Sequence, residues 1–366
     1  MKIVHVIASL GMGGAETMLG LLAERQAADG HDVSIVMLLD KREIHVPQDV
    51  NVMAISPAGR SWTSYPAAVW RLACTLRRLR ADVVHAHMLH ANLASRAIRP
   101  LLRRVLLINT VHAVHETGNV VLRLAYRLLD KLADVTVFVT NAAMDRYRKE
   151  RLVSATRSVV IHNGIDLARF REVEESRHAI RRRLGVADDD LVLTAIGRLT
   201  PDKDYGNLLS AFEIAARQES RIRLLVVGDG ELALQLRMEV RESSIHDRVD
   251  FLGLRNDVPE ILKASDLFVL SSIREGFGLV LAEAMASRIP VVSTRCGGAV
   301  EVVGDCATLV PTENAVALAR GIMRALGMPR EQKLAQIERA EARVSRLFSI
   351  DVAAKNWLEL YEAYSR

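Results

Sequence analysis

The chain has 366 residues, half of them hydrophobic and a quarter charged, which is the composition of a soluble globular protein with an ample core. Its length favours two domains. No apolar stretch reaches the ~18 residues of a membrane span. The short apolar run at the start is interrupted by His5 and followed by a glycine turn, so a signal peptide is not predicted.

The net charge of +5 is distributed unevenly. Residues 1–170 hold 22 Lys and Arg against 14 Asp and Glu, whereas the remainder holds 27 against 30. Such a basic half suits an anionic membrane surface or an acidic acceptor, although a solvated basic face explains it equally well. The excess is concentrated in Arg71, Arg77, Arg78, Arg80, Arg96, Arg99, Arg103, Arg104, Arg123, Arg127 and Lys131.

Nucleic acid is excluded as a partner, because aromatic residues make up only 4% of the chain and no DNA-binding motif is present. The three cysteines, Cys74, Cys296 and Cys306, are odd in number and form no pair with metal-ligand spacing. We therefore expect a reduced, cytoplasmic protein that could lie at the inner face of the membrane.

Short apolar runs alternate with helical patterns along the whole chain, which predicts parallel, doubly wound sheets. The alternation pauses in the polar segment 167–188, where we expect a linker, and then restarts. The sequence thus predicts an α/β protein of two Rossmann-like domains, 1–170 and 171–350, with a final helix in 351–366 that returns to the first domain. Strands are expected at 2–9, 33–39, 50–55, 82–87, 106–110, 135–139, 159–161, 191–196, 223–227, 249–252, 267–270 and 291–293.

The most informative stretch is 271–290, SSIREGFGLVLAEAMASRIP. A buried strand is expected to end at its first residues, and a glycine turn then leads into a helix. A helix N-terminus of this kind presents unpaired backbone N–H groups and suits phosphate. The carboxylates Glu275 and Glu283 would repel phosphate but suit sugar hydroxyls, and we expect Glu283 in the first helical turn. Phosphate and hydroxyls together describe a sugar nucleotide.

Other strand ends of the second half carry polar groups and glycines. Arg198 and Lys203 follow one strand and could neutralise a diphosphate. Gly228 begins a second glycine turn, and the loop at Leu254 could contact a base through its main chain. A further turn contains Gly297-Gly298 and Glu301. Because ligands of doubly wound sheets bind at the carboxyl ends of strands, these turns are expected to share one edge.

Taken together, Gly197-Arg198…Lys203, the Val227–Gly230 turn, Glu275-Gly-Phe-Gly278, the E-x7-E pair and Gly297-Gly298…Glu301 resemble the family 4 retaining glycosyltransferases of the GT-B fold. The resemblance covers nearly the whole chain and includes Gly13-Gly14-Ala15-Glu16 and Asn163-Gly164-Ile165-Asp166. It implies two domains that face each other across a cleft. One departure is Val300, where many relatives have proline.

The resemblance also implies roles for individual residues. Arg198 and Lys203 would bind the donor diphosphate with backbone N–H groups at 278–280. Glu283 would bind the ribose, Glu275 the donor sugar, and His112 would face that sugar. The catalytic set implied is His112, Glu275, Arg198 and Lys203. The donor-binding set implied is Gly13, Gly14, Arg198, Lys203, Gly228, Leu254, Glu275, Gly276, Phe277, Gly278, Leu279, Val280 and Glu283.

The implied reaction is metal-independent transfer of a sugar, with retained anomeric configuration, from a nucleoside-diphosphate sugar to a glycan or lipid-linked acceptor in envelope polysaccharide synthesis. UDP is favoured as the nucleotide, and no cofactor is expected. Asp188-Asp189-Asp190, the one D-x-D sequence, is interpreted as solvated rather than metal-binding. His85 and His87 alternate on a strand and suggest zinc, but a third ligand with suitable spacing is absent, and His5, His31, His45 and His115 are interpreted as structural or exposed.

Three alternatives remain open at this stage. An NAD(P)-dependent dehydrogenase would use the turn Gly11–Gly14 and Asp40, but Glu16 occupies the position of the third glycine. A catalytically silent sugar-nucleotide-binding subunit would need no intact catalytic set. A sugar-nucleotide epimerase would use the same fold without an acceptor.

Overall fold

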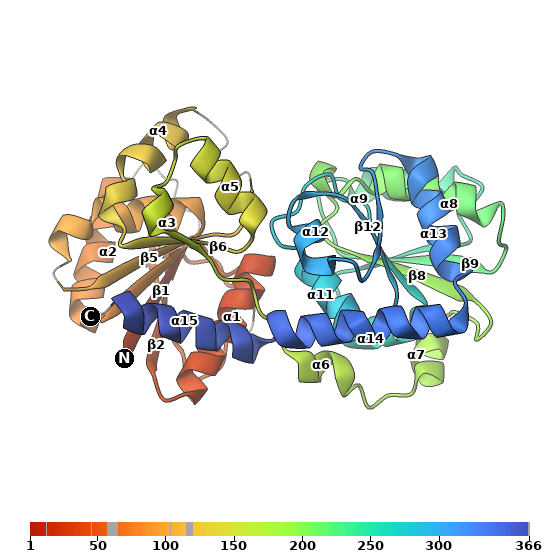
Figure 1. Ribbon diagram of the computed structural model, residues 1–366, viewed down its shortest axis with the longest axis horizontal. Helices are drawn as coiled ribbons and strands as arrows, with labels where there is room; N and C mark the ends of the chain where they lie inside the picture. Colours follow the sequence, from red (N-terminus) through yellow and green to blue (C-terminus); the bar gives the residue numbers. More distant parts are fainter. Residues whose placement is uncertain (12, 45, 57–64, 103, 115–119, 365–366) are drawn as a thin grey trace. The chain divides into compact units, whose positions relative to one another are not determined.

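The computed structural model describes residues 1–11, 13–44, 46–56, 65–102, 104–114 and 120–364. The chain divides into two compact units (Figure 1). Unit 1 comprises Met1–Ile165 and Leu347–Arg366, and unit 2 comprises Asp166–Arg346. Each unit is built on an entirely parallel sheet with helices against it, as a Rossmann-like domain is. The predicted fold class, α/β with two such domains, is confirmed.

The sheet of unit 1 has seven strands in the order β3-β2-β1-β4-β5-β6-β7, so the direction of winding reverses between β1 and β4. Its strands are β1 (Lys2–Ile7), β2 (Asp32–Leu39), β3 (Asn51–Ser56), β4 (Val83–His87), β5 (Leu106–Val111), β6 (Val135–Phe138) and β7 (Ser158–Val160). Its longer helices are α1 (Gly14–Ala28), α2 (Tyr65–Leu79), α3 (Met88–Ala97), α4 (Val120–Leu128), α5 (Asn141–Lys149) and α15 (Ile350–Tyr364).

The last helix of the chain belongs to unit 1. Where the chain re-enters this unit, Ile165 and Ser349 form a parallel bridge. Helix α15 then lies beside α1, and Arg25 of α1 forms an ion pair with Asp351 at 2.6 Å. Trp357 and Tyr361 are fully buried, so this helix supplies part of the core that covers the sheet. A packed C-terminal helix is therefore required to complete unit 1.

One arginine of the basic set is not on the surface. Arg96 is fully buried; its guanidinium donates to Asn109 Oδ1 at 2.5 Å and to Thr136 Oγ1 at 3.0 Å, and lies 4.0 Å from the ring centre of Tyr126. The prediction that this residue contributes to a basic face is wrong, because its charge connects β5, β6 and α4 in the interior. Arg103 lies outside the described residues.

The sheet of unit 2 has six strands in the order β10-β9-β8-β11-β12-β13. Its strands are β8 (Leu191–Ile196), β9 (Ile222–Val227), β10 (Val249–Gly253), β11 (Leu267–Leu270), β12 (Val291–Thr294) and β13 (Thr308–Val310). Its helices of five residues or more are α6 (Leu167–Arg171), α7 (Arg177–Leu184), α8 (Tyr205–Ala216), α9 (Ala233–Arg241), α10 (Val258–Ala264), α11 (Leu279–Ala286), α12 (Gly297–Val303), α13 (Ala315–Leu326) and α14 (Arg330–Leu347). Among the described residues, no helix is both long and apolar enough to cross a bilayer.

The polar segment 167–188 is not a linker. It forms α6 and α7, and α7 packs on α10. Arg181 of α7 is buried, donates to the Ala264 carbonyl at 3.1 Å and forms an ion pair with Asp266 at 2.6 Å. The charge of Arg181 therefore holds α7 against the start of β11. In the following turn, Asp188 and Asp189 are exposed.

Candidate functional site

The loops after β8 and β11 meet because these strands are neighbours in the sheet of unit 2. The Asp202 carbonyl accepts from Ile273 N at 2.9 Å, and Ser271 Oγ donates to the Lys203 carbonyl at 2.8 Å. Lys203 Nζ forms an ion pair with Glu275 Oε1. The side chains are 19% and 7% exposed, so the pair is largely shielded from water. The structure thus brings together the cation and the carboxylate that the sequence assigned to diphosphate and sugar.

The backbone around Glu275 is held in a tight arrangement. Ser272 Oγ donates to Glu275 Oε1 at 2.7 Å, and Gly298 N donates to the Glu275 carbonyl at 3.2 Å. Gly297 has φ +40°, and a Cβ there would lie 2.3 Å from that carbonyl oxygen. Only glycine allows so close an approach. The Gly297-Gly298 turn therefore serves to hold Glu275 in place from the adjacent strand end.

Helix α11 begins directly after this loop. Gly278 precedes it in the left-handed region, with φ +87°, and leaves the N–H groups of the first turn without side-chain caps. Glu283 is the fifth residue of α11, so its predicted place in the first turn is wrong. The helix starts at Leu279, where the pattern places it, and four residues precede Glu283 in it, which puts Glu283 in the second turn. Burial raises the pKa of the Glu283 carboxyl to about 7, against the opposing effect of the nearby Arg169 cation.

The turns after β8 and β9 are also in close contact. Gly228 has φ +129°, and a Cβ there would lie 2.0 Å from the Gly197 carbonyl oxygen. A Cβ at Gly230 would lie 2.5 Å from the Leu199 carbonyl oxygen. These two glycines let the second turn lie against the segment that carries Arg198. Close backbone contacts at these glycines therefore hold the two turns together at this edge of the sheet.

Two of the predicted residues are exposed. Arg198 makes no side-chain hydrogen bond or ion pair with any residue that the structure describes. Leu254, after β10, is 57% exposed. Of the residues around the α11 turn, Phe277, Gly278 and Leu279 are buried, while Gly276 and Val280 are partly exposed.

The predicted residues of unit 1 lie after β1 and β5. Gly13 is in extended conformation before α1, and Gly14 is the first residue of that helix. His112 follows β5 and is 8% exposed. Burial lowers its pKa to about 4, so the ring is neutral at physiological pH.

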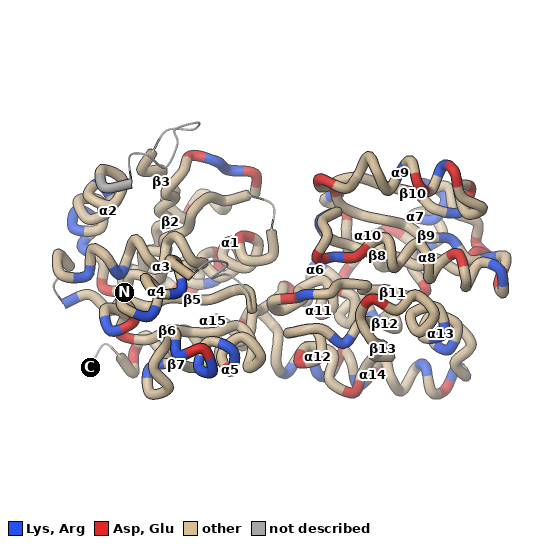
Figure 2. Tube along the Cα trace, turned by 90° about the horizontal axis from the view of Figure 1, so that it is seen from above, with Lys and Arg blue, Asp and Glu red and all other residues tan. Residues whose placement is uncertain are grey.

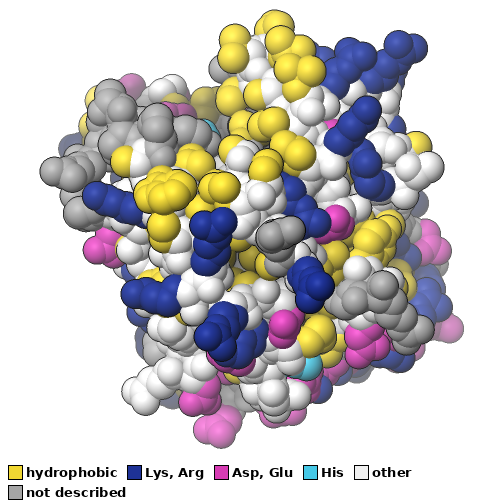
Figure 3. Space-filling model, turned by 90° about the vertical axis from the view of Figure 1, so that its left-hand side faces the viewer, with side chains coloured by type: hydrophobic (Ala, Val, Ile, Leu, Met, Phe, Trp, Pro, Cys, Tyr) yellow, Lys and Arg dark blue, Asp and Glu magenta, His cyan; other side chains and the backbone are white. Residues whose placement is uncertain are grey.

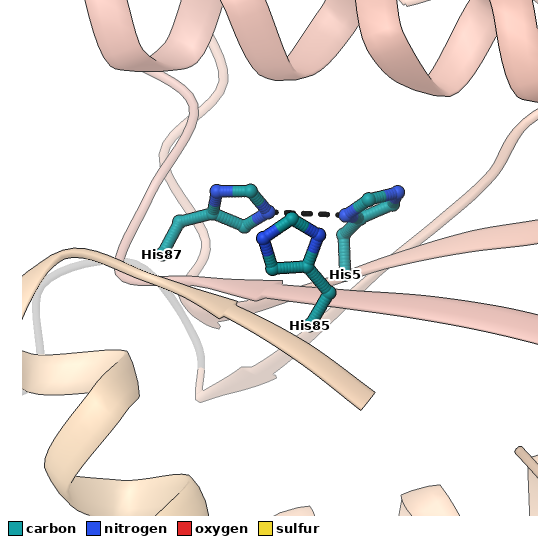
Figure 4. A group of neighbouring side chains, drawn as sticks. All are labelled: His5, His85 and His87. Carbon is teal, nitrogen blue, oxygen red and sulfur yellow. Dashed lines mark hydrogen bonds between the residues drawn. The ribbon is translucent and has the colours of Figure 1, made fainter. Parts of the chain in front are cut away.

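Figure 4 shows three histidines from two neighbouring strands with their rings close together. His5 of β1 lies opposite His85 of β4, and one ring nitrogen from each of His5, His85 and His87 lies within 4.8 Å of the other two. The expectation that His85 and His87 have no third neighbour of suitable spacing is wrong, and so is the exposed alternative for His5, which is fully buried. The parallel register brings the third ring from a strand some 80 residues away. His45 and His115 lie outside the described residues.

Two family models match most of the chain between them. The model described as Glycosyltransferase Family 4 matches residues 12–169, and the model described as Glycosyl transferases group 1 matches residues 176–343. These ranges fall on the two units, and the second contains the strand-end loops of Lys203 and Glu275. The chain belongs to the family 4 glycosyltransferases, and the predicted enzyme class is confirmed.

Named relatives and solved structures agree with this. A UDP-Gal:α-D-GlcNAc-diphosphoundecaprenol α-1,3-galactosyltransferase of Escherichia coli is 30% identical over 61% of this chain and 60% of its own length. An N-acetyl-α-D-glucosaminyl L-malate synthase of Bacillus anthracis is 27% identical over 80% and 78%. Anabaena HepE, solved with UDP and glucose, superposes with a TM-score of 0.84 at 24% identity, covering 99% of each chain. Sucrose-phosphate synthase of Thermosynechococcus elongatus gives 0.85 at 21%, again covering 99% of each. The last two are likenesses of fold.

Proposed function

We propose that the protein transfers a sugar from a UDP-sugar to a glycan or lipid-linked acceptor, with retention of anomeric configuration, in the synthesis of envelope polysaccharide or glycolipid. The observation that carries this proposal is the shielded Lys203–Glu275 pair beside the glycine-capped start of α11. Cation, carboxylate and helix N-terminus match the diphosphate and hydroxyls of one ligand. The substrates of the similar E. coli galactosyltransferase and the ligands of the Anabaena complex support UDP and a lipid-linked acceptor.

In this proposal different residues bind different parts of the sugar-nucleotide donor. Arg198 and Lys203 neutralise the diphosphate, with backbone N–H groups at the start of α11. Glu275 accepts from hydroxyls of the sugar, and Glu283 accepts from hydroxyls of the ribose. His112 contacts the donor sugar. The exposed guanidinium of Arg198 supports its part, because it can form a fork with phosphate oxygens without losing a partner among the residues that the structure describes.

The chemical step follows from where charge develops. The bond between the anomeric carbon and the β-phosphate oxygen breaks, and the nucleoside diphosphate leaves with additional negative charge. Arg198, Lys203 and the N-terminus of α11 stabilise that charge. The acceptor hydroxyl attacks from the same side, forms the new bond to the anomeric carbon, and gives its proton to the departing phosphate oxygen. The positive charge needed is thus supplied by the chain's own groups.

The test is transfer or hydrolysis of a panel of UDP-sugars by the full chain, with two matched variants. Lys203→Met removes the cation paired with Glu275, and Arg274→Met removes an exposed cation of the next loop that pairs with Asp202 at 3.1 Å. We expect the first to lower kcat/KM by about 100-fold, the usual cost of one preorganised charge, and the second to change it by about 2-fold or less. Equal effects of the two variants would refute the role of Lys203.

We also propose that unit 1 contacts an anionic membrane at the inner face, through α4. Figure 3 shows hydrophobic side chains gathered beside Lys and Arg at the top of this face of unit 1. On α4, Val120, Val121, Leu124 and Leu128 are between 55% and 78% exposed. Lys and Arg recur along this helix and α2 (Figure 2). An amphipathic helix of this composition binds a lipid interface by apolar burial and by attraction to anionic headgroups.

Vesicle co-sedimentation can test the membrane contact with a control from the other unit. Leu124→Gln combined with Leu128→Gln should abolish binding to vesicles of anionic lipid. Leu234 and Met238 of α9 have the same four-residue spacing and are 72% and 55% exposed, so the same double change there should have no effect. Binding that is equal on zwitterionic vesicles, or that survives the α4 change, would contradict the proposal.

A further inference from the structure

The buried histidines of unit 1 form a hydrogen-bonded row that ends at His112. His5 Nε2 lies 2.8 Å from Gln26 Oε1, and His5 Nδ1 lies 3.0 Å from His87 Nε2. His87 Nδ1 in turn lies 3.1 Å from His112 Nε2. The row runs from α1 across β1 and β4 to the end of β5. Each of its four members is at most 8% exposed.

We assign the protons of the row from the amide orientation of Gln26. Its Nε2 donates to the Tyr361 hydroxyl at 3.3 Å, so its Oε1 accepts from His5 Nε2–H. A neutral imidazole has one donor and one acceptor nitrogen. His5 Nδ1 therefore accepts from His87 Nε2–H, and His87 Nδ1 accepts from His112 Nε2–H. In His112 the proton is then on Nε2, and Nδ1 carries the lone pair that can accept a hydrogen bond.

A second branch from the same amide is assigned in the same way. The Tyr361 hydroxyl accepts from Gln26 and donates to His85 Nδ1 at 2.7 Å. His85 must then carry its proton on Nε2, which donates to Thr110 Oγ1 at 2.6 Å. All rings are neutral, because burial lowers the pKa of His5 to about 4 and holds the pKa values of His85 and His87 well below the ordinary value.

The hydrogen-bond partners also decide against a metal ion between His5, His85 and His87. A metal ligand must offer a lone pair to the ion. Each of the six ring nitrogens is already within hydrogen-bond distance of a partner in the same cluster, and the protons assigned above leave every acceptor nitrogen with a donor. These three histidines and their partners therefore form a polar network in which each of the six ring nitrogens has a hydrogen-bond partner.

We propose that His87, His5 and Gln26 are positioning residues that hold the His112 ring in one orientation, with its proton on Nε2 and its Nδ1 as a hydrogen-bond acceptor. In that state Nδ1 accepts a hydrogen bond from a hydroxyl of the sugar undergoing transfer. This last step rests on the proposed function, in which His112 contacts the donor sugar. The ring orientation itself does not.

The first test observes the row directly in the full chain with ¹⁵N-labelled histidine. A hydrogen bond between two nitrogens transmits a ¹⁵N–¹⁵N coupling, and the spectrum identifies which nitrogen carries the proton. We expect couplings between His87 Nδ1 and His112 Nε2 and between His5 Nδ1 and His87 Nε2, with the proton on Nε2 each time. Protons on Nδ1, absence of the couplings, or zinc retained stoichiometrically by the purified protein would overturn the proposal.

The second test uses variants of His87 with His85 as the matched control. His87→Phe removes the acceptor for His112, whereas His87→Asn places an amide oxygen near the position of the lost Nδ1. A misplaced catalytic group costs up to about 100-fold in rate. We expect roughly 10-fold or more loss of kcat in His87→Phe, an unchanged KM for the UDP-sugar, and recovery in His87→Asn. His85→Phe alters an equally buried position on the same strand and should retain kcat and the His87–His112 coupling.

The two proposals fail in different ways. If the wild-type chain binds UDP but transfers no sugar, or if His112→Gln has full activity, the proposed function of His112 is wrong. The ¹⁵N–¹⁵N couplings would still show whether the histidines are hydrogen-bonded in a row. If transfer proceeds and the couplings are absent, or if His87→Phe and His85→Phe reduce kcat equally, the positioning role is wrong.

Discussion

Lowering the pH from 7 to 5 should destabilise unit 1 through its buried histidines. Burial lowers the pKa values of His5 and His112 from the ordinary 6.5 to about 4. Between these values the unfolded chain binds protons that the folded chain does not. The stabilisation is therefore fully present above pH 6.5 and is lost as the pH falls toward 4.

The size of the effect follows from the two pKa values. A histidine that titrates at 6.5 when unfolded and near 4 when folded loses about 2 kcal/mol of stability between pH 7 and pH 5. His5 and His112 together then contribute about 4 kcal/mol, and His85 and His87 act in the same direction. Because domains are stable by only about 5–15 kcal/mol, this loss is a large fraction of the whole.

Tryptophan fluorescence can follow unit 1 alone, because the sequence of unit 2, Asp166–Arg346, contains no tryptophan. Urea titrations at pH 7 and pH 5 should give free energies of unfolding that differ by about 4 kcal/mol or more. His5→Phe should reduce that difference by about 2 kcal/mol, whereas replacement of the exposed His246 of unit 2 by Gln should leave it unchanged. A free energy that is the same at both pH values would refute the assignment of a neutral, buried row.

Three further outcomes are expected in unit 2. Binding of a UDP-sugar at pH 6.5 should release roughly 0.5–0.7 proton, because hydroxyls that donate to Glu283 favour the carboxylate and lower its raised pKa. Calorimetry in buffers of different ionisation enthalpy measures the number of protons released. Proton release that persists in Glu283→Gln would contradict this explanation. Glu275→Ala should mainly lower kcat and Glu283→Ala mainly raise the donor KM, and equal effects on both constants would refute the division of roles. Gly228→Ala should lower the melting temperature of unit 2 by several degrees, since its Cβ would meet a carbonyl oxygen at 2.0 Å; Gly206→Ala, with open space at its Cβ, should not lower it.

The sequence predicts the parallel sheets and the loops of unit 2 because both depend on local signals. Strand ends followed by glycine or by a cation can be read from neighbouring residues, and parallel strands place such ends at one edge. The meeting of Lys203 and Glu275 follows from this rule. The pattern also places the start of α11 at Leu279, directly after Gly278. The predicted first-turn position of Glu283 is wrong by one turn, because a helical turn takes 3.6 residues and Glu283 is the fifth residue of the helix.

The features that sequence reasoning missed are produced by contacts between distant segments. The sequence around Arg96 is typical of a basic surface, and the sequence around Arg181 is typical of a polar linker. Only the fold shows that both side chains are buried. His5 joins His85 and His87 through the register of β1 against β4, which no local pattern specifies. Gln26 and Tyr361, from α1 and α15, complete the cluster. The alternating pair His85 and His87 was the local signal of a network whose members come from α1, β1, β4, β5 and α15.

In the proposed function the Lys203–Glu275 pair serves both stability and chemistry, and a double-mutant cycle can separate these roles. Removing one partner of a buried pair leaves a charge without compensation, at a cost of about 3–5 kcal/mol, whereas replacing both is often nearly neutral. We therefore expect Lys203→Met and Glu275→Gln each to destabilise unit 2, and the double variant to regain much of that loss. Activity should not return with stability, because the diphosphate then lacks its cation and the sugar its carboxylate. A double variant that recovers both would show that the pair is structural alone.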